Sequence, residues 1–409
     1  MEKFFYPKSL VLIGLSAKTN NLPRLILENL LRWGYGGRIF GVNPRGDERN
    51  VSGVRMYKDV EDLPDVPDLS VCLIPARLAP ESVEKCGNIG IRRVAVLSGG
   101  FAELGEEGKN LSDLLLRSAR AHDMRLVGPN CLATANTANG LCLPFTPACP
   151  PARGGMSIIS QSGGGGLMLW EILADEHVGM AKFASIGNKL DLNEGDFLEY
   201  FGHDPETSII CMHLEGIECG SRLVQIAKKV RKPIVAYKSN TTSAGRRAAL
   251  SHTASLSSDE DIIDAAFEEA GIIRVYDYGD LVAVAKAFSL PPMGGNRIMV
   301  MSPAGGFAVI GADLCEKAGF EFAHPGEEFY EGLSRFANAG VSKFSNPLDM
   351  GDIYDPHVVA QATYEVMHND NVDGAVYIGS KPRMPEGDNI FRYFFQTDLS
   401  KEIYGAILS

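Results

Sequence analysis

Short apolar segments alternate with amphipathic segments along this chain, and this alternation constrains its fold more than any other feature. Apolar runs of about four to eight residues are typical of strands, and apolar residues that recur every ~3.6 positions are typical of helices. Strands that are apolar along their whole length favour parallel sheets that helices cover on both faces. The pattern therefore predicts an α/β protein.

The first block of the chain, residues 1–148, is predicted to form an open mononucleotide-binding sheet. We expect helices over Leu22–Trp33 and Leu111–His122. Its candidate strands are Ser9–Gly14, Arg38–Asn43, Leu69–Pro75, Val94–Ser98 and Arg125–Val127. A proline-rich segment, residues 143–151, follows as a candidate linker.

Two further blocks repeat the alternation. The second, residues 152–290, has expected helices over Leu223–Val230 and Ile262–Ala270, and its candidate strands are Met156–Ser160, Lys182–Ile186, Ser208–Leu214 and Pro233–Lys238. The third, residues 296–409, is expected to open with a strand over Arg297–Ser302 and to contain a later one over Gly374–Gly379. It is short for a complete doubly wound domain, so we expect it to be truncated or divergent.

Composition excludes several classes of function. The net charge of −12 argues against a nucleic acid or an anionic membrane as partner. No apolar run approaches the ~20 residues of a membrane-spanning helix, and the N-terminus lacks the pattern of a signal peptide. The eight cysteines are scattered without a CxxC pair, which favours a reduced, cytoplasmic protein without a zinc or other metal site.

Each block opens with a strand, a loop of small residues and a helix. Such a loop presents free N–H groups at the positive end of a helix dipole, where anions bind. The middle loop has the strongest signal, because four glycines, Gly163–Gly166, let the backbone wrap an oxyanion and Ser160 and Ser162 add hydroxyl donors. Tight packing of helix against strand is the alternative reason for such glycines, above all in the third loop, residues 302–307.

The strand ends of the first block predict a ligand site. The first loop has neither a GxGxxG nor a Walker A pattern, and the second strand ends in Asn43-Pro44-Arg45, without the acid that would bind the ribose of NAD. An arginine there suits a phosphate instead. Further small or polar residues, Pro75, Ser98 and Asn130, follow the later strands. Since parallel strands end at one edge, we expect these residues to line it.

His252 is the candidate nucleophile. It sits in a run of small and hydroxyl residues, Ala248–Asp259, where other groups can approach the ring closely. Glu215 follows a predicted strand and could accept a hydrogen bond from one ring nitrogen, which directs chemistry to the other. A polar loop histidine and a solvated acid are the alternatives. Ser258 or Asp259 is expected to cap the next helix.

Together these residues resemble the α subunit of NDP-forming acyl-CoA synthetases, a family that includes ADP-forming acetyl-CoA synthetase and, more distantly, succinyl-CoA synthetase. The resemblance covers about residues 8–350. Its most specific motifs are Val42-Asn43-Pro44, Gly128-Pro129-Asn130-Cys131, Ser160-Gln161-Ser162-Gly163, Ile186-Gly187-Asn188-Lys189, Leu214-Glu215-Gly216, Ser251-His252-Thr253-Ala254-Ser255-Leu256 and Asn346-Pro347-Leu348-Asp349.

This resemblance implies a Rossmann-like CoA-binding domain followed by flavodoxin-like domains with parallel sheets. It also implies that acyl-CoA, ADP and phosphate are interconverted with an acid, CoA and ATP through phosphorylation of His252. Glu215 would orient His252, and the helix start at Ser162, Gly163 and Gly164 would hold the phosphoryl group. CoA would lie near Gly14, Ser16, Lys18, Asn43, Arg45, Pro75, Ser98 and Asn130.

The resemblance further implies a partner. No ATP-grasp domain is expected after residue 290, so ATP or ADP and Mg²⁺ would be bound by a separate β subunit or a fused domain, with a small carboxylic acid or acyl-CoA as substrate. A hetero-oligomer is therefore expected. The chain departs from the family in Lys18–Leu22, which lacks the usual glycine, and in Phe391–Ser409.

Two other functions compete with this interpretation. A noncatalytic CoA-binding regulatory protein is favoured by the altered first loop and by the missing nucleotide domain, but the retained His252 argues against it. An NAD-dependent oxidoreductase is suggested by the fold class alone, and the missing glycine fingerprint and ribose-binding acid argue against it.

Overall fold

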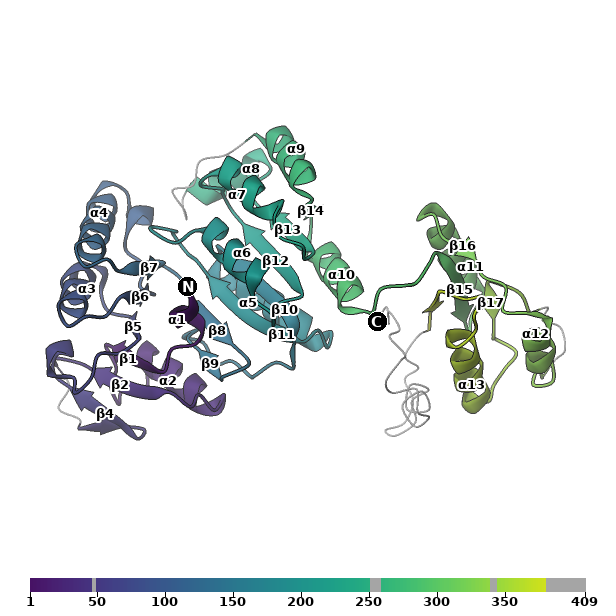
Figure 1. Ribbon diagram of the computed structural model, residues 1–409, viewed down its shortest axis with the longest axis horizontal. Coiled ribbons are helices and arrows are strands. Elements are labelled where there is room, and N and C mark those ends of the chain that lie inside the picture. Colours follow the sequence, from purple (N-terminus) through teal and green to yellow (C-terminus); the bar gives the residue numbers. More distant parts are fainter. Residues whose placement is uncertain (46–48, 251–258, 339–343, 380–409) are drawn as a thin grey trace. The chain divides into compact units, whose positions relative to one another are not determined.

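The computed structural model describes residues 1–45, 49–250, 259–338 and 344–379 (Figure 1). The chain divides into two compact units, Met1–Ser289 and Leu290–Ser409. In the part of the chain that the structure describes, no helix is long and apolar enough to cross a membrane. The sheets are mostly parallel and carry helices, so the expected α/β class is confirmed.

The first sheet contains the predicted strands of residues 1–148. Its order is β3-β4-β2-β1-β5-β6-β7, and the neighbours are parallel except β3 and β4. The strands are β1 Ser9–Ile13, β2 Arg38–Val42, β3 Asn50–Val51, β4 Val54–Tyr57, β5 Leu69–Cys72, β6 Arg93–Val96 and β7 Arg125–Val127. The helices are α1 Glu2–Phe5, α2 Leu22–Arg32, α3 Ala79–Asn88 and α4 Glu106–Arg120, with 3₁₀ turns at Val60–Asp62, Ala76–Leu78 and Ala102–Leu104.

Both faces of this sheet are buried, as its apolar strands predict. In β1, Leu10 and Leu12 belong to one core, whereas Val11 and Ile13 belong to the other. Within this sheet, sequence reasoning missed the short β3–β4 hairpin, because its strands are brief and lack a continuous apolar run.

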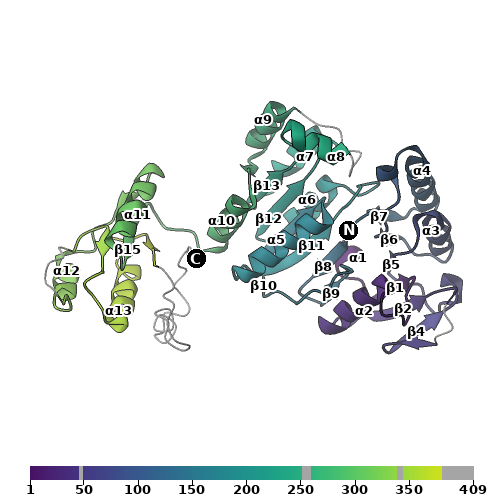
Figure 2. The ribbon, with the colours of Figure 1, turned by 180° about the vertical axis from the view of Figure 1, so that it is seen from behind.

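The second sheet has the order β14-β13-β12-β10-β11-β8-β9. Its strands are β8 Ala133–Asn136, β9 Leu141–Cys142, β10 Arg153–Ser160, β11 Met180–Ser185, β12 Ile209–Leu214, β13 Ile234–Lys238 and β14 Ile273–Val275. Its helices are α5 Gly163–Asp175, α6 Glu194–His203, α7 Gly220–Ala227, α8 Ser243–Leu250, α9 Glu260–Ala270 and α10 Tyr278–Ser289 (Figure 2). The five strands from β10 to β14 pair in parallel, and β8 and β9 are antiparallel.

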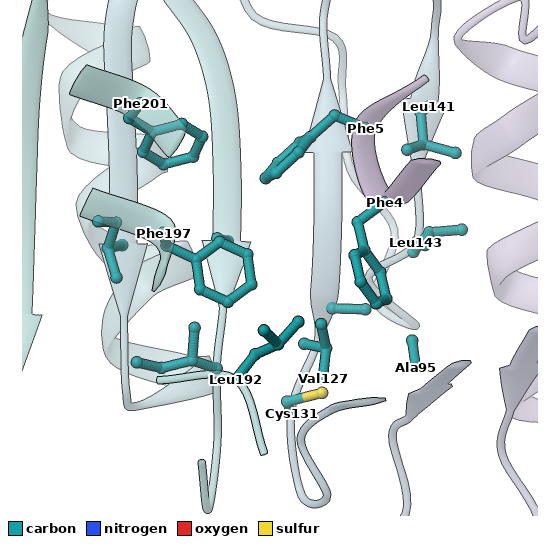
Figure 3. Packing of buried hydrophobic residues seen from close by; sticks show 14 of the residues in the cluster. Phe4, Phe5, Ala95, Val127, Cys131, Leu141, Leu143, Leu192, Phe197 and Phe201 are labelled. Carbon is teal, nitrogen blue, oxygen red and sulfur yellow. The ribbon is translucent and has the colours of Figure 1, made fainter. Parts of the chain in front are cut away.

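The two sheets share one core. Strands β8 and β9 precede residue 148 but pair within the second sheet, and apolar residues of both sheets form one continuous cluster. Helix α1 enters this cluster with Phe4 and Phe5, which lie between Phe197 and Phe201 on one side and Leu143 on the other (Figure 3). The division into domains 1–148, 152–290 and 296–409 stays a prediction.

The proline-rich segment is held against the first sheet's helix α2. The amide nitrogen of Asn29 donates to the carbonyl oxygens of Pro144 and Thr146 at 2.9 and 2.7 Å, and its oxygen accepts from the N–H of Ala148 at 3.2 Å. The indole of Trp33 donates to the Ala148 carbonyl at 3.1 Å. Such buried hydrogen bonds fix the segment, so it is more ordered than a flexible linker.

The second unit contains a four-stranded parallel sheet. Asn346 ties it together, because its amide nitrogen donates to the carbonyl oxygens of Ile298 and Ala323 and its oxygen accepts from the N–H of Val300. The strands are β15 Arg297–Ser302, β16 Glu321–Phe322, β17 Leu348–Asp349 and β18 Gly374–Tyr377, and the helices are α11 Gly305–Lys317, α12 Glu327–Ser334 and α13 Pro356–Met367.

We predict that Phe5→Ala destabilises the first unit by about 3–5 kcal/mol, since a fully buried ring is removed and a cavity is left. Phe5 packs against Tyr200 and Phe201 at ring centroid distances of 5.0 and 5.3 Å. The free energy of unfolding from urea titration tests this. Leu31→Ala, at a site that is 52% exposed on α2, is the control and should cost less than about 0.5 kcal/mol. Equal effects of the two variants would contradict the prediction.

Candidate active site

The loop between β10 and α5 forms one wall of the candidate site. Ser162 is the N-cap of α5, and its Oγ accepts a hydrogen bond from the N–H of Gly165 at 3.1 Å. The Ser160 hydroxyl donates to the Ser162 carbonyl at 2.6 Å and so fixes the turn. The first N–H groups of a helix have no partners within the helix, so those of Gly163 and Gly164 are available to an anion.

Two side chains packed against the first turn of α5 require glycine at position 165. A Cβ there would lie 2.6 Å from Cε1 of His213 and 2.8 Å from Oη of Tyr278. The Tyr278 hydroxyl donates to the Gly165 carbonyl at 3.1 Å and lies 2.9 Å from Nδ1 of His213. Burial lowers the pKa of His213 to about 4, so its ring is neutral near pH 7. A neutral ring with its proton on Nδ1 completes this chain of hydrogen bonds.

Glu215 follows β12 directly, and its backbone is tied to the same loop. The N–H groups of Glu215 and Gly216 both donate to Oε1 of Gln161, at 3.0 Å each. Nζ of Lys189 donates to the Gly216 carbonyl at 2.9 Å and forms a buried ion pair with Glu194 at 3.0 Å. The main chain beside the Glu215 carboxylate is thus held by groups from two other segments.

A pocket of about 470 Å³ lies beside this loop. It is lined by all three predicted phosphate-binding residues, Ser162, Gly163 and Gly164, and by Glu215 and Asn130, so the structure brings these five together. A Cβ on Gly164 would meet nothing within 4 Å, which leaves open space at the helix start. The geometry therefore suits a bound phosphoryl group. Glu215 also lines a second pocket, of about 440 Å³.

The predicted nucleophile, His252, lies outside the described residues, and so does its pairing with Glu215. The elements that flank it, α8 and α9, are described. Asp259 caps α9, because its side chain accepts a hydrogen bond from the N–H of Asp261 at 3.1 Å, as predicted for this position. Leu214 and Lys238 are register partners at the ends of β12 and β13. The chain therefore leaves toward residue 252 at the sheet edge that carries Glu215.

The residues expected to bind CoA follow neighbouring strands of the first sheet. Each lies just beyond the carboxyl end of a strand: Gly14, Ser16 and Lys18 after β1, Asn43 and Arg45 after β2, Pro75 after β5, Ser98 after β6 and Asn130 after β7. Because these strands are parallel neighbours, their ends share one edge (Figure 1). Lys18 and Arg45 are exposed there, as cations that meet phosphates must be.

Asn21 orders the first loop, and sequence reasoning missed it. Its amide nitrogen donates to the Gly14 carbonyl at 2.9 Å, and its oxygen accepts from the N–H groups of Ser16 and Arg24 at 3.0 and 3.1 Å. The stretch that lacks the usual glycine is therefore built around an asparagine N-cap. An asparagine two residues before Pro23, at the start of an apolar-periodic segment, was the available signal.

The third small-residue loop has a different electrostatic setting. Helix α11 begins at Gly305, and a Cβ there would lie 2.5 Å from Oδ2 of Asp349. The carboxylate of Asp349 thus already occupies the neighbourhood of this helix N-terminus. Its negative charge weakens the site for another anion, so the loop is a poorer phosphate site than Ser162–Gly164.

Two family models match the first unit. The model of a CoA-binding domain matches residues 8–137, and that of a succinyl-CoA ligase-like flavodoxin domain matches residues 153–288. The α subunit of ADP-forming acetate–CoA ligase I from Pyrococcus furiosus is 36% identical over 364 residues, which cover 87% of this chain and 77% of that protein.

Other relatives agree with these matches. The ADP-forming acetate–CoA ligase of Methanocaldococcus jannaschii is 37% identical over 348 residues, but the chain spans only 48% of its length. The solved structure of the dinucleotide forming acetyl-coenzyme A synthetase 1 of Ca. Korarchaeum cryptofilum, in complex with phosphate and ADP, superimposes with a TM-score of 0.83. It is 30% identical, and the match covers 92% of this chain and 81% of that one.

A mononucleotide-type sheet that shares a core with a flavodoxin-like sheet defines a CoA-ligase fold. The chain belongs to the family of NDP-forming acyl-CoA synthetases and is similar to the α subunits of ADP-forming acetate–CoA ligases. The expected ligase class and CoA as cofactor are confirmed, and the alternative of a noncatalytic regulatory protein is not supported.

The buried neutral His213 predicts acid-sensitive stability. Its folded pKa of about 4 lies below the ordinary value of 6.5, so between these limits the unfolded chain binds a proton that the folded one does not. The contribution, of the order of 3 kcal/mol, is complete above pH 6.5 and is lost as the pH falls toward 4. Unfolding free energies of His213→Gln should lose this pH dependence, whereas those of the exposed control His203→Gln should keep it. Parallel pH curves for the parent and His213→Gln would contradict this.

Proposed function

We propose that this chain forms and cleaves an acyl phosphate and carries the phosphoryl group on His252, as the α subunit of an ADP-forming acyl-CoA synthetase. The observation that carries the proposal is the pocket in which the start of α5 and Glu215 meet. Free helix N–H groups and the Ser162 hydroxyl stabilise phosphoryl oxygens there, at positions fixed before the reaction.

In this proposal Glu215 is the residue that orients His252. A carboxylate that accepts a hydrogen bond from one ring nitrogen fixes the tautomer and leaves the other nitrogen to attack phosphorus. It also stabilises the positive charge that the ring acquires during phosphorylation. The backbone hydrogen bonds of Glu215 to Gln161 support this role, because they set the carboxylate's starting point relative to the phosphate loop.

The strand-end residues of the first sheet fit CoA. Lys18 and Arg45 are exposed cations for its phosphates, and Asn130 lies both at this edge and in the wall of the pocket. When bound, CoA supplies the thiol that accepts the acyl group. The Asn43 amide donates to the Leu15 carbonyl at 3.0 Å, so it ties the first loop to the end of β2.

The nucleotide requires a partner in this proposal. Relatives are named as α subunits, which implies another subunit. We infer that an ATP-grasp subunit or fused domain binds ATP or ADP together with Mg²⁺, and that the complex is a hetero-oligomer in the cytoplasm. All eight cysteines are described and free, in agreement with a reducing compartment.

The relay is tested with the chain, an ATP-grasp partner subunit, Mg²⁺ and γ-labelled ATP. We expect acid-labile, base-stable label on the parent and none on His252→Ala. Glu215→Gln should be labelled about 100-fold more slowly, because the ring loses its orienting carboxylate. The exposed His203→Ala is the matched control and should be labelled like the parent. Undiminished labelling of His252→Ala would sink the proposal.

The pocket lining predicts the class of acid. Its described residues include five with apolar side chains, Leu97, Cys131, Leu132, Phe145 and Leu167, and the carboxylate of Glu215. None of the described lining residues is lysine or arginine. A second substrate carboxylate would lose hydration near a like charge, without a cation to compensate it.

We therefore expect monocarboxylic acids with an apolar chain as substrates. Butyrate and succinate are a matched pair of equal chain length, and kcat/KM for butyrate should be at least about 100-fold higher, which corresponds to ~2.7 kcal/mol. Initial rates of acyl-CoA formation with the complete complex measure this ratio. Equal values for the two acids would contradict the predicted substrate class.

A further inference from the structure

Gln161 joins the two halves of the candidate site and is almost completely buried, at 7% exposure. Its own N–H donates to the His213 carbonyl at 2.9 Å, which extends the β10–β12 pairing by one residue. Its side-chain oxygen accepts both N–H groups at the end of β12, those of Glu215 and Gly216. The side chain therefore has a single defined position.

These contacts also determine the orientation of the Gln161 amide, that is, which end is the oxygen and which is the nitrogen. Two backbone N–H groups face one end of the Gln161 side chain, so that end must be the oxygen, since an NH₂ group there would oppose two donors. Nε2 must then point away from the β12 end. Gln161 lines the pocket that holds Ser162, Gly163 and Gly164.

Nε2 has no acceptor within the part of the chain that the structure describes, and it is not among the described polar atoms that are both buried and without a partner, so it is accessible from the pocket that Gln161 lines. A donor that is accessible from a pocket and has no partner in the protein can donate to an acceptor that binds there. The first N–H groups of α5 are neighbouring free donors, and they bind the same kind of acceptor, an oxyanion.

We propose that Gln161 donates a hydrogen bond from Nε2 to a phosphoryl oxygen bound at the start of α5, while its Oε1 holds the backbone of Glu215. The inference rests on the proposed function and adds a residue to the phosphate site that the sequence motifs did not assign. One rigid amide thereby sets the distance between the phosphoryl group and Glu215.

The neutral charge of this donor fits its position. A lysine or arginine here would attract the carboxylate of Glu215, which lines the same pocket, and would hold a phosphoryl group so strongly that its transfer is slowed. An amide binds the oxyanion through directed hydrogen bonds alone, without that competition.

The test uses Gln161→Glu in the complete complex with an ATP-grasp partner. Glutamate keeps an oxygen for both backbone N–H groups, but it replaces the donor by a negative charge. We expect kcat/KM for inorganic phosphate, in the direction of ATP synthesis, to fall about 100- to 1,000-fold, as on loss of one oxyanion donor. KM for acyl-CoA, measured in the same direction, should stay within threefold. Gln225→Glu, on the exposed face of α7, is the matched control and should resemble the parent.

The pH dependence of the rate with phosphate gives a second test of the proposal in the same variant. The carboxyl group that Gln161→Glu introduces becomes a donor again when it is protonated. We therefore expect the phosphate rate of this variant, relative to the parent, to recover as the pH falls toward the pKa of that carboxyl group. A purely structural role would lower the phosphate and acyl-CoA parameters together and would show no such recovery. Both measurements are ratios, so a loss of active enzyme cancels out of them. They therefore test the role of Gln161 even if the variant is less stable.

The outcomes separate the two proposals. If the parent takes no label from ATP, the proposed relay fails. If the parent is labelled but Gln161→Glu keeps kcat/KM for phosphate within threefold of the parent, the role of Gln161 is wrong and the relay stands. If the phosphate and acyl-CoA parameters fall equally without recovery at low pH, Gln161 is a packing residue and the proposal is overturned.

Discussion

The hydrogen bonds between Gln161 and the end of β12 are the constraint on which the candidate site depends. They join two adjacent strand ends of a parallel sheet, of which one begins the proposed phosphate loop, residues 161–164, and the other leads into Glu215. Neither strand end alone makes a site, because helix N–H groups without a carboxylate only bind anions. Held together, they form a pocket with hydrogen-bond donors on one wall and a hydrogen-bond acceptor, the carboxylate of Glu215, on another.

The continuous core between the two sheets explains why this pocket can include residues from both. Phe4 and Phe5 of α1 are fully buried in that core, and their carbonyl oxygens accept hydrogen bonds from the side chains of Thr134 and Asn136 on β8. The carbonyl groups at the C-terminal end of the short helix are thereby satisfied, as buried backbone groups must be. The first sheet, which carries Asn130, thus has a fixed position relative to the second, which carries Ser162.

Sequence patterns predicted the parallel strands and the residues at their ends, because apolar runs and the turns after them are local signals. Three features of the site were missed, and two of them have no local signal. Gln161 pairs with a residue 54 positions away, Tyr278 reaches Gly165 across 113 positions, and both contacts depend on strand register. Asn21 has local partners, but several other loop conformations could satisfy the same backbone groups. Its position in the sequence alone therefore does not fix its role. His252 and its pairing with Glu215 stay predictions.

The distribution of charge follows from what each part of the proposed site must do. Exposed cations, Lys18 and Arg45, lie at the sheet edge assigned to CoA, where solvent screens their charges. The phosphates of CoA only have to be bound there and are not transferred. Around the phosphate loop the donors are neutral: backbone N–H groups, the Ser162 hydroxyl and the Gln161 amide. Burial keeps His213, packed against that loop, neutral as well. A phosphoryl group that has to arrive and leave is better held by directed neutral donors than by a buried cation, because uniformly tight binding lowers the energy of the bound state without lowering the barrier to transfer.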